Sequence, residues 1–295
     1  MQNLFKKNPN KIKESTSQRV TFTIYFILFI IFSAICIYPV FWCVINSLKT
    51  TEEFAFNPNG LPEQWNFKFY GEIIKSFKVG SAGFGTMVFN SIWLAFGGQV
   101  LNILASMCVA YPLARYNFRG KKFFYGIIIF RITIPIIGAG AAGYKLLRSF
   151  QMINNPPLYL ITYFSGFDMA ALIMYGYFKN ISKEYSEAAF IDGANVWQTF
   201  FKVIVPQAMP CIAALYVSNV MGQWNNFTSP QIYLPKYPNL ALGIYEVDSG
   251  AAHFRPNGQA KKYGAVVISS IVPILLFTLS QKLMLENMTV GGLKG

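Results

Sequence analysis

Three long stretches of the sequence carry no charged residue. The uncharged runs 20–48, 79–114 and 203–235 hold 29, 36 and 33 residues. A helix needs about 20 consecutive, mostly apolar residues to cross the hydrocarbon core of a bilayer. Only 13% of the chain is charged, whereas an average soluble domain carries about 25% charged residues. Each run is therefore long enough to cross a membrane once, and the chain has too few charges to coat a soluble surface.

The pattern of apolar runs predicts an all-α, polytopic membrane protein with six transmembrane helices. The first predicted helix is too long for a secretion signal and has no small-residue cleavage site after it, so we expect an uncleaved anchor. Pro39 is expected to kink it. The six-helix domain 22–285 is expected to lie between an N-terminal segment, 1–21, and a tail, 286–295. The predicted helices are Phe22–Asn46, Gly85–Ala110, Phe123–Gly143, Leu158–Phe178, Gln207–Ser229 and Gly264–Leu283.

The distribution of basic residues predicts the orientation, because short cytoplasmic loops of membrane proteins are enriched in Lys and Arg. One side of the predicted membrane holds 14 basic residues, and the other holds ten together with six acids. We therefore expect a multi-pass protein of the cell membrane with both termini, 1–21 and 286–295, in the cytoplasm. The net charge of +13 does not indicate nucleic-acid binding, because the basic residues lie at the ends of apolar runs rather than in a dense patch.

Reactive residues are few and scattered. All four cysteines lie inside apolar runs, and His253 is the single histidine of the chain. Without a cluster of Cys, His and carboxylate residues, neither a metal site nor a histidine-based catalytic relay is expected. The sequence also lacks a Gly-x-x-x-x-Gly-Lys-Ser/Thr phosphate-binding loop. We therefore expect no enzyme activity, no cofactor and no ATP site in this chain.

The predicted connection between the fourth and fifth helices, 180–206, has a structure of its own. Ser182 can cap a short helix in which Ala188 and Ala189 form a face of small side chains. Gly193 can adopt the left-handed conformation that ends a helix. A second helix with an amphipathic pattern follows and leads to Pro206. The segment predicts a helix, a glycine turn and a helix, although an amphipathic helix lying on the membrane surface would have a similar pattern.

This segment carries the motif Glu-Ala-Ala-x-x-Asp-Gly-Ala with a later Ile-x-Pro. It resembles the signature loop of permease subunits in binding-protein-dependent ABC importers. The resemblance covers nearly the whole chain and is greatest to the carbohydrate branch, specifically the second permease of maltose-type systems. The family often has Pro at the position of Ser182. The further segments that carry the resemblance are Trp224–Phe227 with Pro230, Leu240–Tyr245, Gln281–Lys282 and Thr289–Gly295.

The resemblance implies a type I ABC importer permease fold and a set of partners. These partners are a homologous second permease chain, two ATPase subunits that use ATP, an extracellular solute-binding protein and a sugar or oligosaccharide, all within membrane lipid. The family's loop docks into a cleft on an ATPase subunit, and its tail reaches toward the ATPase dimer. The docking residues implied here are Glu187, Ala188, Ala189, Asp192, Gly193, Ala194 and Pro206.

Polar and aromatic residues within the predicted helices and at their ends are candidates for a substrate path. Sugars are commonly held by aromatic stacking and by hydrogen bonds from neutral polar side chains. Any one such residue is more often a packing or interface residue than a ligand contact. The candidates are Arg131, Tyr144, Tyr163, Asp168, Tyr175, Asn219, Gln223 and Trp224.

Apart from Lys282 at the end of the sixth predicted helix, Arg131 and Asp168 are the charged residues inside the predicted helices. At about 1.5 Å per residue, Arg131 lies about 12 Å from the start of the third helix and Asp168 about 15 Å from the start of the fourth. Both would lie near the middle of a core about 30 Å thick. Because isolated charges there are costly, we expect them to form an ion pair or to line the substrate path together.

Two alternatives remain from the residues alone. An ABC importer permease for a non-sugar solute would share the same motif. An ion-coupled secondary transporter would also have many spans, but it would be expected to show inverted repeats and more intramembrane carboxylates. The long outer segments Lys49–Phe84 and Pro230–Tyr263 are equally compatible with solvated loops and with a surface that meets an extracellular partner.

Overall fold

The computed structural model describes residues 15–134, 140–248 and 259–285. The predicted tail, 286–295, most of the N-terminal segment and His253 lie outside these residues. Within them the chain is helical, with one exception to the all-α prediction. Strands β1 (Lys78–Val79) and β2 (Ala82–Gly83) form a short antiparallel pair.

The first helix, α1 (Thr16–Asn46), begins six residues before the predicted start at Phe22. Its N-terminus is fixed by a capping box, in which the Ser15 hydroxyl accepts from the backbone N–H of Gln18 and the Gln18 side chain accepts from the N–H of Ser15. Pro39 lies inside the helix. Two short helices follow on the way to the strands, α2 (Thr51–Phe56) and α3 (Lys68–Ser76).

The second predicted span is a continuous helical run, from Phe84 to Arg115. It consists of α4 (Phe84–Ile92), a π-helical turn η1 (Trp93–Gly97) and α5 (Gly98–Arg115). The run extends the predicted helix at its C-terminal end by five residues, to Arg115.

The third and fourth predicted spans are not continuous helices, which corrects the prediction. Helix α6 (Lys121–Thr133) ends where Pro135 follows, because proline disfavours a helical residue before it. Helix α7 (Gly140–Ser149) begins beyond the gap in the described residues. The fourth segment is divided into α8 (Pro156–Leu160), η2 (Ile161–Tyr163) and α9 (Met169–Asn180), and the chain between η2 and α9 has Gly166 at φ +66°.

The fifth predicted span begins earlier than Gln207. Helices α11 (Val196–Thr199), η3 (Phe200–Ile204) and α12 (Val205–Trp224) form one run of 29 residues. The π-helical turn η3 ends two residues before Pro206, whose missing N–H would otherwise interrupt regular helix bonding. The remaining helices are α10 (Glu184–Ile191), α13 (Thr228–Tyr233), α14 (Leu240–Asp248) and α15 (Gln259–Leu285).

Four helical runs in the described part of the chain are long and apolar enough to cross a membrane. They are Thr16–Asn46, Phe84–Arg115, Val196–Trp224 and Lys262–Lys282. The segments of the third and fourth predicted spans are not among them, because α6 and α9 have only 13 and 12 residues.

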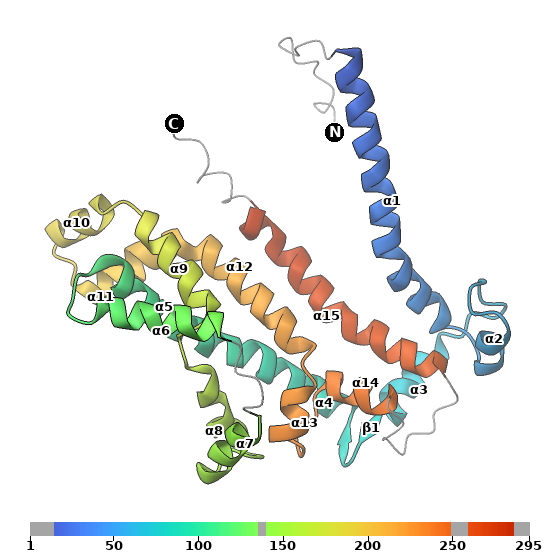
Figure 1. Ribbon diagram of the computed structural model, residues 1–295. Helices are drawn as coiled ribbons and strands as arrows, with labels where there is room; N and C mark the ends of the chain where they lie inside the picture. The colour runs from blue at the N-terminus through green and yellow to red at the C-terminus, as the bar shows by residue number, and fades with distance from the viewer. Residues whose placement is uncertain (1–14, 135–139, 249–258, 286–295) are drawn as a thin grey trace.

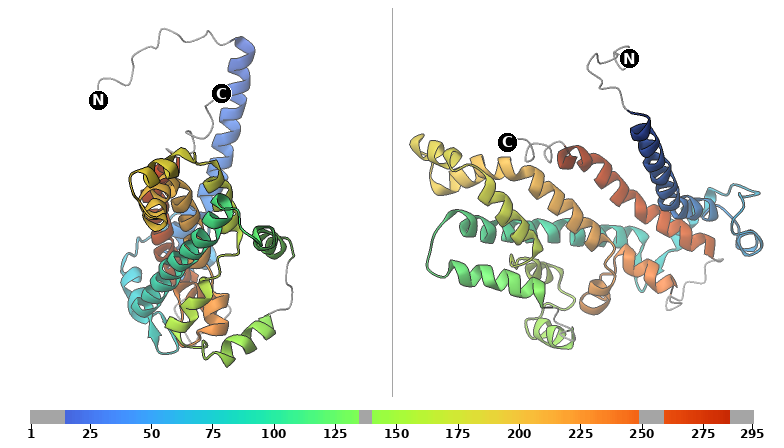
Figure 2. Two further views of the ribbon diagram at one scale, coloured as in Figure 1. Left: turned by 90° about the vertical axis from the view of Figure 1, so that its left-hand side faces the viewer. Right: turned by 45° about the horizontal axis from the view of Figure 1, so that its top comes forward.

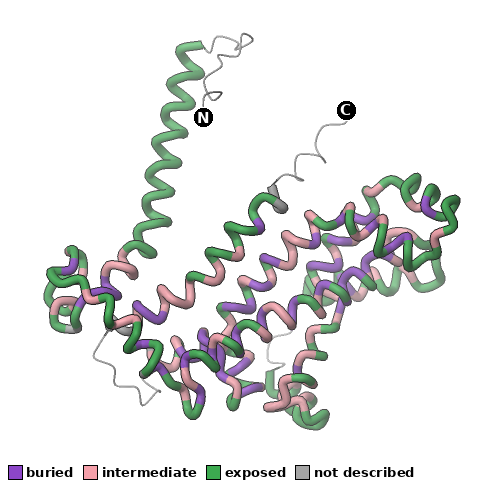
Figure 3. The backbone as a smooth tube through the Cα atoms, turned by 180° about the vertical axis from the view of Figure 1, so that it is seen from behind, coloured by how far each residue is buried: buried purple, intermediate pink, exposed green. Residues whose placement is uncertain are grey.

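The core lies where α5, α9 and α12 pack together, and α15 lies alongside α12 (Figure 1). Figure 2 shows the same bundle from two further sides, with α1 projecting away from it. Most of α1 is exposed along its length, whereas the buried residues are concentrated in the central helices (Figure 3). Most of the large apolar side chains of α1 between Val20 and Phe41 are therefore exposed, and they are suited to contact lipid or another protein.

Candidate functional site

The turn that ends α10 has the geometry expected from its glycine. The backbone N–H of Ala194 donates to the carbonyl of Ala189 at 2.9 Å, and that of Gly193 donates to the carbonyl of Phe190 at 3.0 Å. This pair of bonds is a Schellman motif, which requires a left-handed residue after the helix. Gly193 supplies it with φ +81°. The predicted helix and glycine turn are confirmed.

The helix after the turn begins at a capping box that the sequence analysis did not identify. The Asn195 side chain accepts from the backbone N–H of Gln198, and the Gln198 side chain accepts from that of Asn195, both at 2.9 Å. The Asn-x-x-Gln spacing was the available signal. The Schellman motif ends at Ala194 and the capping box begins at the next residue, Asn195. Hydrogen bonds therefore define the whole connection between α10 and α11. We call residues 184–199 the hairpin.

One face of the hairpin is exposed. Ile191 is 86% exposed, and Glu187, Ala188 and Asp192 are exposed as well. The sequence analysis placed Ala188 and Ala189 on one face of the helix. In the structure Ala189 is only 8% exposed and packs inward, whereas Ala188 is exposed. Beside the turn lies an open hollow of about 360 Å³. It is lined by Ala189, Asp192, Gly193, Ala194, Gln198, Lys202 and Val203.

Aromatic packing joins the hairpin to the helix bundle. Phe200 follows α11 and lies 4.5 Å from Tyr111 of α5 and 6.3 Å from Phe178 of α9, between ring centroids. Tyr111 and Phe178 are themselves 5.7 Å apart, and all three are buried. Phe200 thus connects the end of the hairpin to α5 and α9 by direct ring contacts. Pro206 lies one turn further on and is exposed.

A second group of polar residues lies within the bundle and is organised around Asp168. Its carboxylate accepts from the Asn102 amide at 2.7 Å, the Ser106 hydroxyl at 3.0 Å and the backbone N–H of Ala171 at 3.0 Å. The last bond makes Asp168 the N-cap of α9. The Asn219 amide of α12 donates in turn to the Asn102 side chain at 3.3 Å. This network joins α5, α9 and α12, and sequence analysis missed Asn102 and Ser106.

Arg131 does not pair with Asp168, so the predicted ion pair is wrong for this structure. The guanidinium donates through Nη1 to the Ser165 hydroxyl at 2.6 Å and to the Phe167 carbonyl at 2.9 Å. The depth argument assumed a continuous fourth helix, and the break before α9 invalidates it. Within the described residues, each of the two charges is held by neutral groups.

The loop that carries these acceptors, 164–168, depends on Gly166. A Cβ at this position would lie 2.7 Å from the Ala105 carbonyl oxygen and 2.8 Å from a Val109 methyl group. The residue also has φ +66°. Both features favour glycine, because only glycine adopts this backbone conformation without strain and without a side chain. The loop is thus pressed against α5, which fixes Ser165 and Phe167 beside Arg131.

A column of tyrosines lies near the other end of the bundle. Tyr144 stacks on Tyr233 at 6.4 Å, Tyr233 on Tyr159 at 5.8 Å, and Tyr159 contacts Tyr163 edge-on at 6.0 Å, between ring centroids. The predicted candidates Tyr144 and Tyr163 thus belong to one group. Sequence analysis did not select Tyr159 and Tyr233, which lie in separate segments with no motif.

The other predicted path residues differ in accessibility. Tyr175 packs against Tyr125 at 5.1 Å. Gln223 is 9% exposed, and its Nε2 has no hydrogen-bond partner in the described chain. Trp224 is 2% exposed and donates from Nε1 to Ser269 of α15, so in this structure it is a packing residue.

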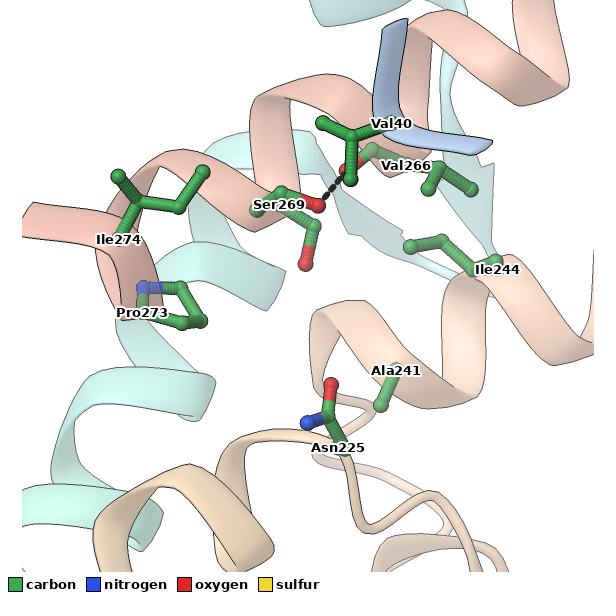
Figure 4. A pocket seen from close by; sticks show the side chains of 9 residues that line it. Val40, Asn225, Ala241, Ile244, Val266, Ser269, Pro273 and Ile274 are labelled. Atoms are coloured by element: carbon green, nitrogen blue, oxygen red, sulfur yellow. Dashed lines mark hydrogen bonds between the residues drawn. The ribbon is translucent and has the colours of Figure 1, made fainter. Parts of the chain in front are cut away.

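A pocket of about 460 Å³ opens between α1, α14 and α15 (Figure 4). Its lining is mostly apolar, with Asn225, Ser269 and Ser270 as the polar residues. The Ser270 hydroxyl already donates to the Val266 carbonyl at 2.8 Å. Because none of its lining residues is charged, the pocket resembles the apolar interior more than a polar binding site.

Comparison with known proteins agrees with this architecture. The model of the family described as "Binding-protein-dependent transport system inner membrane component" matches residues 102–288. The chain is 28% identical over 260 residues to the diacetylchitobiose uptake system permease protein of Streptomyces coelicolor, covering 84% of this chain and 81% of that protein. It is 30% identical over 210 residues to the arabinooligosaccharides transport system permease protein of Halalkalibacterium halodurans, covering 70% and 73%.

A solved structure gives the corresponding match in three dimensions. It is the crystal structure of a bacterial ABC transporter involved in the import of the acidic polysaccharide alginate. The TM-score is 0.73 at 25% sequence identity, and the match covers 91% of this chain and 98% of that chain.

Proposed function

The chain belongs to the family of binding-protein-dependent transport system inner membrane components, and we propose that its cargo is a sugar or oligosaccharide. As a family member it is a permease subunit of an ABC importer, not an enzyme, and it resides in the membrane as a multi-pass protein. The family excludes the ion-coupled secondary transporter that the sequence alone left open.

The hairpin is the observation that supports this function best. Its exposed face presents a large aliphatic side chain, Ile191, to the surroundings, next to an open hollow. The hairpin also exposes Tyr185, Val196 and Trp197, and exposed apolar patches are typical of protein–protein contacts. We propose that residues 184–199 dock on one of two ATPase subunits, and that Glu187, Ala188, Asp192, Gly193 and Ala194 line the contact. Closure of the ATPase pair then moves α5 and α9 through the contacts of Phe200.

Six membrane crossings and cytoplasmic termini are part of the proposal. In it, α6 forms the third crossing, and the broken segment α8–α9 forms the fourth. An interrupted helix is tolerated in a membrane where its backbone is covered by protein, and loop 164–168 packs on α5. The first residues of α1 and the last of α15 lie toward the top of Figure 1 with α10, opposite α13 and α14. This arrangement supports both termini on the side of the ATPase.

The proposed translocation complex contains a second, homologous permease. Helix α1 leaves large apolar side chains exposed from Val20 to Phe41, and it projects away from the bundle (Figure 2). An extracellular solute-binding protein would deliver the cargo. The tail 286–295 is proposed to reach toward the ATPases.

The proposed substrate class rests on the tyrosine column, the neutral polar network and the relatives. Stacked tyrosines and side-chain amides suit the apolar faces and hydroxyls of sugars. The named relatives take up diacetylchitobiose and transport arabinooligosaccharides. The residues that we propose for the path are Arg131, Tyr144, Tyr163, Asp168, Tyr175, Asn219 and Gln223.

The test is reconstitution of the complete importer in liposomes. The chain is purified with its second permease and ATPase, and the cognate binding protein is screened against oligosaccharides, peptides and other solutes. Sugar-dependent stimulation of ATP hydrolysis, with uptake of the same sugar, is the expected result. Uptake of a peptide alone would overturn the sugar proposal. ATP hydrolysis by the isolated, homogeneous chain would overturn the proposal that the partner ATPase subunits hydrolyse the ATP.

A further inference from the structure

The region around the tyrosine column has an unusual charge composition. The segments 140–167 and 225–240 contain no Asp or Glu, but they contain Lys145, Arg148 and Lys236. All three cations are exposed. By contrast, the outer segment 50–78 carries four acids among its lysines. The absence of acids thus distinguishes segments 140–167 and 225–240 from segment 50–78.

The two acid-free segments form one structural unit. The backbone N–H of Asn154 donates to the Tyr233 carbonyl at 2.8 Å, and that of Lys236 donates to the Asn154 side chain at 2.9 Å. The stacking of Tyr144 on Tyr233 joins them again. We call residues 140–163 and 228–237 the cationic lobe. Three positive charges without a neighbouring acid in the sequence of the lobe create a positive potential that attracts anions.

Arg131 adds a positive charge deeper in the protein. It lies ten residues into α6, or about 15 Å along the helix. Its side chain is exposed, and both of its hydrogen bonds use Nη1 and go to uncharged acceptors. Asp168, two positions beyond the loop residue Gly166, is already engaged by three other donors. Among the described residues, the Arg131 guanidinium therefore forms hydrogen bonds only to neutral groups and no direct ion pair.

A charged residue at the membrane depth proposed for α6 is costly, and such residues usually pair with an opposite charge, bind backbone carbonyls or face a water-filled path. Here the side chain is also held in place, because loop 164–168 is fixed to α5 by the close approach of Gly166 and by the hydrogen bonds that Asp168 accepts from α5. A guanidinium with free donors on a fixed scaffold is suited to two-pronged binding of a carboxylate or sulfate-type group.

We propose that the sugar carried by this importer is anionic, and that Arg131 binds its acidic group while the cationic lobe attracts it to the entrance. The proposal deepens the proposed function and rests on it. The solved relative involved in import of an acidic polysaccharide shows that the fold accommodates such cargo. The competing occupant of Arg131 is a carboxylate of the second permease, and the test separates the two.

The test uses the complete importer in liposomes. The probes are uronic-acid oligosaccharides and their carboxyl-reduced, neutral counterparts of equal length, each chosen by binding to the cognate binding protein. The wild type is expected to take up the acidic probe. Arg131→Gln is expected to lower that uptake about tenfold or more. Arg131→Lys should recover part of it, because lysine keeps the charge but lacks the paired N–H donors of the guanidinium. Lys75→Gln, on α3 outside the lobe, is the matched control for loss of one outer positive charge.

The lobe is tested separately by the combined change Lys145→Gln, Arg148→Gln and Lys236→Gln. Electrostatic attraction acts mainly on encounter, so KM for the acidic probe should rise several-fold at low salt while kcat stays the same. The difference from wild type should shrink as salt is raised. An unchanged KM at low salt contradicts this role of the lobe.

The remaining outcomes are distinct. Uptake of neutral probes alone overturns the anionic inference and leaves the sugar proposal standing. Equal loss of acidic and neutral uptake in Arg131→Gln, in complexes that assemble normally, assigns Arg131 to the permease interface and also overturns it. If Arg131→Gln leaves uptake of the acidic probe unchanged, the inference that Arg131 binds the acidic group is also overturned. If no oligosaccharide is transported at all, the proposed function itself fails.

Discussion

The side-chain amide of Asn102 and the carboxylate of Asp168 lie 2.7 Å apart and join α5 to the first turn of α9. Asp168 is also held by Ser106 and by the N–H of Ala171. Its charge is therefore used to fix the start of a helix at a break in the chain. This explains why an acid lies within a segment that is otherwise apolar.

Replacing Asp168 tests this role. Asp168→Ala removes the N-cap, a loss of about 1 kcal/mol. It also removes the acceptor of the Ser106 hydroxyl and the shorter of the two hydrogen bonds of the Asn102 amide, which keeps the Tyr163 carbonyl at 3.5 Å. We expect the apparent Tm of the detergent-solubilised complex to fall by at least about 2–4 °C. Asp168→Asn keeps a capping oxygen and should lose less. Equal destabilisation by the two variants would show that the charge, not the cap, is what matters.

The relation of Arg131 to Asp168 gives a second prediction. If the two formed a buried ion pair, the double change Arg131→Ala with Asp168→Ala would be milder than Arg131→Ala alone, because neither charge would be stranded. Since each has separate partners, we expect no rescue. Expression level and apparent Tm of the two single variants and the double variant measure this. A double variant more stable than Arg131→Ala would restore the ion-pair hypothesis.

Gly166 provides a third prediction. In Gly166→Ala the new methyl group would meet the Ala105 carbonyl at 2.7 Å, and the backbone would be strained at φ +66°. The strain alone is about 1–2 kcal/mol, so we expect a lower Tm and a displaced loop with reduced uptake. Gly176→Ala on α9 is the matched control, because an added Cβ there meets no atom within 4 Å. Equal behaviour of the two variants would contradict close packing of the loop on α5.

Much of the architecture was accessible from local sequence. Uncharged runs predicted helices α1, α5, α12 and α15, although their ends shifted by several residues. The hairpin was also predictable, because Gly193 acts within its own turn. In these cases the determining interactions lie within a few residues along the chain, so a pattern in the sequence is sufficient.

The break before α9 was not predictable in the same way. Its apolar composition favours a continuous helix, and glycine is tolerated in membrane helices. The interruption is stabilised by Asn102 and Ser106, more than 60 residues away. Neither residue has a distinguishing motif, because each is a neutral polar residue in an uncharged run. Sequence analysis selected Tyr144 and Tyr163 but missed Tyr159, Tyr233 and the grouping of all four, since three separate segments contribute the members of the column.

A fourth prediction concerns the exposed face of the hairpin. Ile191 is 86% exposed, so changing it should not disturb the fold of the chain. If it inserts into an ATPase subunit, Ile191→Asp would place a charge in an apolar contact and should reduce ATPase retention during purification severalfold or more. Ile191→Leu is the control and should retain binding. Normal ATPase retention with Ile191→Asp would place the docking contact elsewhere.

A graded series at Gly193 tests the turn itself. An added Cβ meets no atom within 4 Å, so the effect of substitution comes only from φ +81° and from the bond that the Gly193 N–H donates to Phe190. Asn adopts the left-handed region more readily than other non-glycine residues, so Gly193→Asn should be close to wild type and Gly193→Ala moderately impaired.

Gly193→Pro fixes φ near −65° and removes the donor. It should abolish uptake and the stimulation of ATP hydrolysis by the loaded binding protein, while the chain still inserts and pairs with the second permease. Uptake by Gly193→Pro at the wild-type rate would mean that the conformation of this turn is not required for coupling.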